Sequence, residues 1–142
     1  MNGLQLFLPC AAGVESWLAN EVVSITQLPT DDVKAVRAGV LVNGSWRHAM
    51  LLNLHCRLAQ RVLVQLQRSP YSKEDDLYQA AQQVAWELWF TPYQTFKIEI
   101  TAHHSPLKSL NFAALKIKDA VVDRFRDRAG MRPNVETQWP DV

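Results

Sequence analysis

The sequence predicts an α+β protein built from two small consecutive domains. In the first half, segments with apolar residues at every second position alternate with segments of helical three- and four-residue spacing, in the order βαββαβ. This order is that of a split βαβ, or ferredoxin-like, arrangement. The second half follows a short break at Arg68-Ser69-Pro70 and gives two helices and one strand. A chain of 142 residues, 48% of them hydrophobic, suits one ordinary globular domain or two small ones.

The elements of the first domain, residues 1–68, follow from local patterns. Extended segments are expected at residues 4–8, 33–43 (with a bend at 38–39) and 58–67. A helix follows Gly13, and Ser45 caps a second helix that runs from residue 46 to about 57. The apolar face of the first helix carries Val14, Trp17, Leu18, Val22 and Ile25.

The second domain, residues 71–142, begins with a helix that Ser72 and Asp75 cap and that Pro92 ends, with Leu77, Ala81, Val84 and Leu88 as its apolar stripe. Residues 95–101 alternate as a strand, and Ser109 or Asn111 caps a long helix that ends near Arg128. Its predicted buried stripe is Leu110, Ala114, Ile117, Val121 and Phe125.

A lone strand cannot satisfy its own hydrogen bonds. We therefore expect residues 95–101 to pair with the first domain or with strands beyond Val142, which makes the chain a fragment. An edge left unpaired favours self-association.

Composition and motifs exclude several classes of protein. No apolar run approaches the roughly 20 residues of a membrane span. The first ten residues lack the basic start of a signal peptide, so a cytoplasmic location is expected. Cys10 and Cys56 are too far apart for a metal site, and neither a metal cluster nor a nucleophile–base pair is indicated. Four tryptophans are expected to pack in the core or between domains, namely Trp17, Trp46, Trp86 and Trp89.

Positive charge gathers between Lys97 and Arg132. This stretch holds eight Lys/Arg and four acids, a local charge of +4 in a chain whose net charge is +1. Such a basic face is typical of a module that contacts a phosphate backbone. The candidate RNA-binding residues are Lys108, Lys116, Lys118, Arg124, Arg126, Arg128 and Arg132.

Each of these residues also has an ordinary explanation on a solvated helix. Ion pairs at three-residue spacing are available to Lys116–Asp119, Asp123–Arg126 and Arg124–Asp127. Arg124 and Arg128 lie near the apolar stripe, where their stems could cover the edge of the core. The ordinary explanation is preferred for any one residue, whereas the group as a whole favours RNA contact. Lys108 and Arg132, which have no obvious partner in sequence, are the better individual candidates.

A series of short motifs carries a family resemblance. In chain order they are Gly13-Val14-Glu15 with Leu18 and Glu21; Arg57-Leu58-Ala59 with Arg61; Tyr71-Ser72; Asp76-Leu77-Tyr78; Trp86, Phe90 and Pro92; Thr95-Phe96; Lys116-x-Lys118-Asp119-Ala120-x-Val122-Asp123-x-Phe125; Arg132-Pro133-Asn134-Val135; and Pro140-Asp141. Along essentially its whole length, the chain resembles the N-terminal part of the bacterial 23S rRNA guanine-N2 methyltransferases that carry a THUMP domain.

The resemblance implies a ferredoxin-like domain followed by a THUMP domain whose last strands are missing. It also implies a module that binds 23S rRNA and presents a base to a separate catalytic domain, where S-adenosylmethionine would bind. The chain itself has neither a Gly-rich loop for that cofactor nor an Asn/Asp-Pro-Pro-Tyr/Phe motif. Two alternatives stay open. One is a THUMP module of a tRNA-modifying enzyme, and the other is a protein-interaction domain that docks on an acidic partner.

Overall fold

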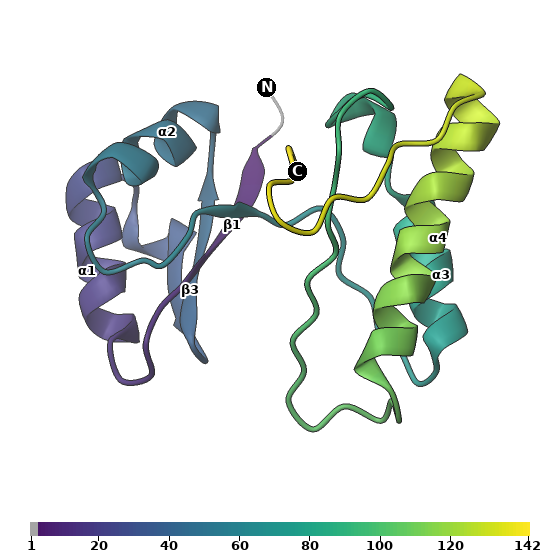
Figure 1. Ribbon diagram of the computed structural model, residues 1–142. Coiled ribbons are helices and arrows are strands. Elements are labelled where there is room, and N and C mark those ends of the chain that lie inside the picture. Colours follow the sequence, from purple (N-terminus) through teal and green to yellow (C-terminus); the bar gives the residue numbers. More distant parts are fainter. Residues whose placement is uncertain (1–2) are drawn as a thin grey trace. The chain divides into compact units, whose positions relative to one another are not determined.

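The computed structural model describes residues 3–142, which divide into two compact units, Met1–Leu66 and Gln67–Val142. The first unit packs helices on a β-sheet, and the second contains helices and an extended segment (Figure 1). Each unit has its own apolar core. Within the described residues, no helix combines the length and the apolar character that a membrane crossing requires.

The first unit has the predicted βαββαβ order. Its elements are β1 (Leu4–Pro9), α1 (Glu15–Thr26), a 3-10 turn (Thr30–Asp32), β2 (Val33–Val36), β3 (Gly39–Gly44), α2 (Trp46–His55) and β4 (Leu63–Val64). The strands form one antiparallel sheet in the order β2-β3-β1-β4. This confirms the ferredoxin-like fold expected from the alternation of periods.

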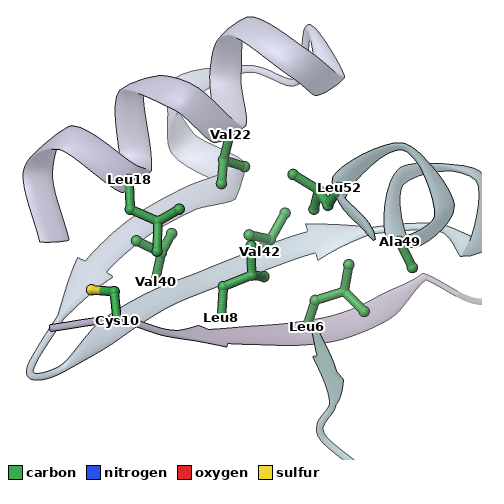
Figure 2. Packing of buried hydrophobic residues seen from close by; sticks show 9 residues of the cluster. All are labelled: Leu6, Leu8, Cys10, Leu18, Val22, Val40, Val42, Ala49 and Leu52. Carbon is green, nitrogen blue, oxygen red and sulfur yellow. The ribbon is translucent and has the colours of Figure 1, made fainter. Parts of the chain in front are cut away.

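The core of this unit lies between the sheet and the two helices (Figure 2). Leu6 and Leu8 of β1 face the helices because side chains two apart share one face of a strand. The register pairs these residues with Val42 and Val40 of β3. The helices contribute Leu18, Val22, Ala49 and Leu52.

Two local features fix the connections. The β2–β3 turn places Ala38 at φ 60° and brings Gly39 against β1, where an added Cβ would lie 2.5 Å from the Phe7 ring. Only glycine fits there. Ser45 caps α2, since its hydroxyl accepts a hydrogen bond from the His48 N–H while the His48 ring accepts one from the Ser45 N–H.

Three expectations for the first unit are wrong in detail. The last strand spans Leu63–Val64 rather than residues 58–67, although the N–H groups of Gln60 and Gln65 still donate to β1 on either side of it. Helix α2 ends at His55, two residues early. Two of the tryptophans expected to pack are exposed, Trp17 with 71% and Trp46 with 52% of its surface.

The second unit consists of α3 (Glu74–Gln83), a 3-10 turn (Trp86–Leu88) and α4 (Leu110–Ala129), with an extended segment between the turn and α4. Its core is a cluster of aromatic and branched residues. The Phe90 ring lies 4.8 Å from that of Phe125 and 5.9 Å from that of Phe96. Val121 and Val122 of α4 complete the cluster.

Helix α3 ends at Gln83 instead of reaching Pro92. The Trp86 indole N–H donates to the Ala81 carbonyl at 2.7 Å and so satisfies one of the carbonyls that a helix end leaves free. Val84, the next residue after the helix, is already extended. Leu88, which was predicted to lie on the apolar stripe of this helix, therefore lies beyond the helix and is exposed. At the start of α3, Asp76 rather than Asp75 accepts the hydrogen bonds, from the N–H groups of Ser72 and Lys73.

Residues 95–101 form an extended segment, as predicted, but not the regular β-strand that was expected. Phe96 forms one parallel bridge with Val135, and Thr95 and Lys97 bond to Val142 on the other side. Phe96 is buried and Ile98 half-buried, whereas Lys97 between them is exposed. Among the described residues, these partners reach only the first part of the segment, and regular strand geometry needs partners along its length.

Candidate nucleic-acid interface

Helix α4 positions most of the cationic candidates. Ser109 caps its start by accepting a hydrogen bond from the Phe112 N–H, and Gly130 ends it in the left-handed conformation at φ 67°. Arg126 and Arg128 lie in the last turn, where cations interact favourably with the helix dipole. The buried face carries Ala113, Ala120, Val121, Val122 and Phe125, whereas Leu110 of the predicted stripe is exposed.

The Arg124 side chain forms hydrogen bonds within the second unit. Its guanidinium donates two hydrogen bonds to the Glu87 carboxylate, at 2.8 and 2.9 Å, and a third to the Gln82 carbonyl. The bidentate bond from Arg124 holds the pKa of Glu87 at about 2. Arg124 therefore joins α4 to α3 and the following turn, and three of its N–H donors already bond within the unit.

Lys116 and Tyr78 form a second link between α3 and α4. The Lys116 ammonium lies 5.9 Å from the Tyr78 ring centre and 5.7 Å from that of Phe112. The Tyr78 hydroxyl donates to Asp123 at 2.6 Å, and this bond, with burial and the charge of Asp123, raises the pKa of Tyr78 to about 12. Lys116 is thus held by aromatic rings rather than by the expected Asp119.

Lys118 and Arg126 have acidic neighbours on the same helix. The Lys118 ammonium lies 3.1 Å from Asp119, and Arg126 lies 3.9 Å from Asp123, the pair expected from the sequence. Asp119 and Arg126 are each more than half exposed. Exposed pairs of this kind contribute little to stability and are readily exchanged for a phosphate.

The remaining three candidates lie at the two ends of α4 and beyond it. Lys108, Arg128 and Arg132 are exposed, and none of them forms an ion pair within residues 3–142. Arg128 has only the longer-range attraction of Glu87. A cation without an intramolecular hydrogen bond or ion pair can bind a phosphate without first breaking a bond. These three residues are therefore the strongest candidates for phosphate contact in the second unit.

The charge count from the sequence missed a second basic stretch, because it summed those residues together with the acidic residues of the rest of the chain. Residues 33–73 contain seven Lys/Arg and no carboxylate, namely Lys34, Arg37, Arg47, Arg57, Arg61, Arg68 and Lys73. The acids of the first unit all precede this stretch, at Glu15, Glu21, Asp31 and Asp32. A sliding charge count along the sequence would have found it.

The carboxylates of α1 serve the fold. Glu15 accepts hydrogen bonds from the N–H groups of Gly13 and Ala38. Glu21 accepts from the Cys56 thiol and from the N–H groups of Arg57 and Leu58, and these bonds outweigh the effect of burial and lower its pKa. Within residues 3–142, His, Cys, Asp and Glu form no group of three that could hold a metal ion.

Comparison with known proteins places both units. The profile described as "THUMP domain" matches residues 71–142, half of the chain. The chain belongs to the THUMP domain family. The profile described as "RlmL ferredoxin-like domain" matches residues 5–63, ahead of the THUMP domain.

Curated relatives of this THUMP-containing chain are ribosomal RNA large subunit methyltransferases K/L. Those of Pseudomonas putida W619 and Pseudomonas aeruginosa PAO1 are each 38% identical over 138 residues, or 97% of this chain. The chain spans 18% and 19% of their lengths. A crystal structure described as a predicted N6-adenine-specific DNA methylase from Listeria monocytogenes superposes with a TM-score of 0.81 at 22% identity, covering 90% of this chain and 33% of that one. This similarity concerns the fold.

Proposed function

We propose that the chain is the RNA-binding, substrate-presenting module of an S-adenosylmethionine-dependent 23S rRNA guanine-N2 methyltransferase that acts in the cytoplasm. The proposal is supported by the order of the two domains and by their likeness to the ribosomal RNA large subunit methyltransferases K/L. Methyl transfer would belong to the remaining four-fifths of such a protein, since the chain covers only 18% of the first relative.

The observation that carries the proposal is the group formed by Lys108, Arg128 and Arg132, which we call the free-cation group. Because these side chains are exposed and lack intramolecular ion pairs, each can neutralise one phosphate and release condensed counterions. Lys118 and Arg126 add two cations whose surface pairs exchange at small cost. Arg124 and Lys116 contribute by holding α4 against α3.

The residues of this chain do not fit S-adenosylmethionine. Within the described first unit, a glycine stands between a strand and a helix at two places: at Gly44, where the next N–H, that of Ser45, is bound by the His48 ring, and in the turn between β1 and α1. Its Gly13 N–H is bound by the Glu15 carboxylate at 2.8 Å. That N–H is therefore already engaged and is not free to bind a carboxylate of the cofactor. We therefore assign no step of methyl transfer to these residues.

A salt titration of binding to a 23S rRNA hairpin tests the proposal. Wild type is compared with Lys108→Ala/Arg128→Ala/Arg132→Ala and with Arg47→Ala/Arg57→Ala/Arg68→Ala, which removes the same charge from the other basic stretch. Each lost phosphate contact should reduce the slope of log K against log salt by about 1. We expect the free-cation variant to lose roughly 2 to 3 units of slope.

The outcomes separate the alternatives. An unchanged slope in the free-cation variant, with a flattened slope in the first-unit variant, would move the RNA face to residues 33–73. Displacement of the RNA by heparin as readily as by structured RNA would favour docking on an acidic protein. Tighter binding of a tRNA than of the rRNA hairpin would favour a tRNA-modifying enzyme.

We also propose that the edge at Ile100 and Thr101 permits weak self-association, because strand edges template pairing between chains. Sedimentation velocity over a range of concentrations measures it. A sedimentation coefficient that stays constant at the monomer value would refute this part.

A further inference from the structure

Helices α1 and α2 both pack on one face of the first unit's sheet, which leaves the other face without either helix. Leu6 and Leu8 point from β1 towards the helices, as do their partners on β3 (Figure 2). Side chains alternate along a strand, so the residues next to these project from the opposite face. We call this side the open face, and the strand register places six side chains on it: Gln5, Phe7, Lys34, Leu41, Asn43 and Leu63.

Phe7 occupies the centre of the open face, and its ring lies low on the sheet. The Cε2 and Cζ atoms fill the space above Gly39 of β3, since a Cβ added to that glycine would lie 2.5 and 2.6 Å from them. A ring that lies across a glycine turns one of its faces towards the backbone and the other outward. Leu41 and Leu63 stand beside Phe7 on the two adjoining strands, the first half-buried and the second 41% exposed. The centre of the open face is therefore an apolar surface with an aromatic ring in its middle.

The polar residues of the open face are two amides and a lysine. Gln5 and Asn43 lie opposite each other on β1 and β3, one register position away from Phe7 on the same face. Each amide offers both a hydrogen-bond donor and an acceptor. Lys34 is exposed and lies at the end of the row that contains Phe7, on the edge strand β2. No residue of the open face is acidic, and residues 33–73 contain no carboxylate at all.

This combination of groups matches a nucleotide whose base is unpaired. The base can stack on the outward face of the Phe7 ring, and its polar edge can bond to the two amides. Its phosphate can approach Lys34 without meeting a carboxylate. A purely apolar protein partner would instead bury the amides and the lysine without hydrogen bonds, which is costly. A duplex stem would present phosphates, but its bases are already stacked and paired.

We propose that the open face of the first unit holds one unpaired nucleotide of the bound RNA, with its base stacked on Phe7. The inference rests on the RNA-binding function proposed above and adds a contact surface on the first unit. Phe7 carries no charge, so its contribution to binding is separate from the counterion release that the cations supply. The two proposals can therefore fail independently.

The test compares the binding of two RNAs, a blunt duplex and the same duplex with a single-stranded extension of three adenosines. Phe7→Leu keeps an apolar side chain and removes the ring, and Phe7→Tyr restores a ring. Trp17→Leu is the matched control, because it removes an aromatic ring that is 71% exposed on α1, in the layer of the helices. We expect Phe7→Leu to bind the extended RNA about tenfold more weakly than wild type, with Phe7→Tyr and Trp17→Leu within about twofold. The blunt duplex should bind all four proteins equally.

A second measurement uses wild type alone and does not depend on how a variant folds. With ¹³C-labelled leucine methyl groups, the Leu41 and Leu63 resonances should shift with the extended RNA and not with the blunt duplex, because a base stacked on Phe7 would lie beside them. Leu54 is the control, since it is 76% exposed on α2 and should not respond.

Several results would overturn the open face as a nucleotide site and leave the salt-dependent function of the free-cation group intact. One is equal binding of the extended RNA by wild type and Phe7→Leu, and another is a pair of Leu41 and Leu63 resonances that stay in place. A loss that Phe7→Tyr does not recover, or that is as large with the blunt duplex, would overturn it as well. If neither RNA binds wild type at low salt, both proposals fall.

Discussion

Replacing Glu87 by Gln should weaken the second unit by about 2 kcal/mol at neutral pH. The pKa of Glu87 is lowered from 4.5 to about 2, chiefly by its hydrogen bonds to Arg124. A shift of that size corresponds to roughly 3 kcal/mol of interaction with the charged form. The Glu87 side chain is 29% exposed, so solvent screening reduces this figure. Charge-assisted hydrogen bonds of this kind are typically worth about 1.5–3 kcal/mol, which supports the lower value.

The effect should depend on pH in a definite direction. Because the folded-state pKa lies below the unfolded one, the carboxylate contributes its full stabilisation above about pH 4.5 and loses it as pH falls towards 2. Wild type and Glu87→Gln should therefore differ most at pH 7 and converge in acid. Native-state hydrogen exchange of the Val121 and Val122 amides reports the opening of this unit without a contribution from the other.

Asp75→Asn is the matched control, since Asp75 is an exposed acid at the start of the neighbouring helix α3. It should change the opening free energy by no more than about 0.5 kcal/mol. A Glu87→Gln loss that stays constant between pH 7 and pH 3, or one no larger than that of Asp75→Asn, would refute the view that Arg124 is held within the fold. Arg124 would then return to the set of RNA-binding candidates.

Three further substitutions test other parts of the structure. Leu52→Ala, which empties a fully buried position between α2 and the sheet, should cost the first unit about 2–5 kcal/mol in denaturant unfolding, and a cost under 1 kcal/mol would contradict the core as described. Ser109→Ala should lower the protection against hydrogen exchange in the first turn of α4 by about 1 kcal/mol, and unchanged protection would mean that the Ser109 hydroxyl does not stabilise the helix start. Glu21→Gln should speed alkylation of Cys56 by iodoacetamide at pH 8, because burial and the Glu21 carboxylate both raise the pKa of that thiol; an equal acceleration at Cys10 would point to general loosening instead.

The fold of the first unit was predictable because its signals are local and agree with one another. Alternation placed Leu6 and Leu8 on one face, and Ser45 marked the start of α2. The errors arise where contacts between residues far apart in the sequence, or beyond the helix itself, determine where an element ends. The end of α3 depends on the indole of Trp86 bonding back to Ala81, which the spacing of apolar residues does not reveal.

The extended segment of the second unit shows the same difference between what local sequence and what distant contacts determine. Its alternating residues predicted the conformation correctly, and Phe96 is buried as expected. Whether such a segment becomes a ladder depends on partners far along the chain, and here Val135 and Val142 meet only its beginning.

The candidate interface was predictable as a region but not as a set of contacts. A charge count treats Arg124 and Arg128 alike, four residues apart on one helix. Only Arg124 hydrogen-bonds to Glu87, which lies 37 residues earlier in the chain, and only the folded chain brings these two residues into contact. Charge density therefore measures the attraction that a surface can exert on RNA, whereas the assignment of each cation depends on which carboxylates the fold has already placed against it. By that criterion we expect phosphate contacts at Lys108, Arg128 and Arg132, towards the ends of α4, rather than in its middle.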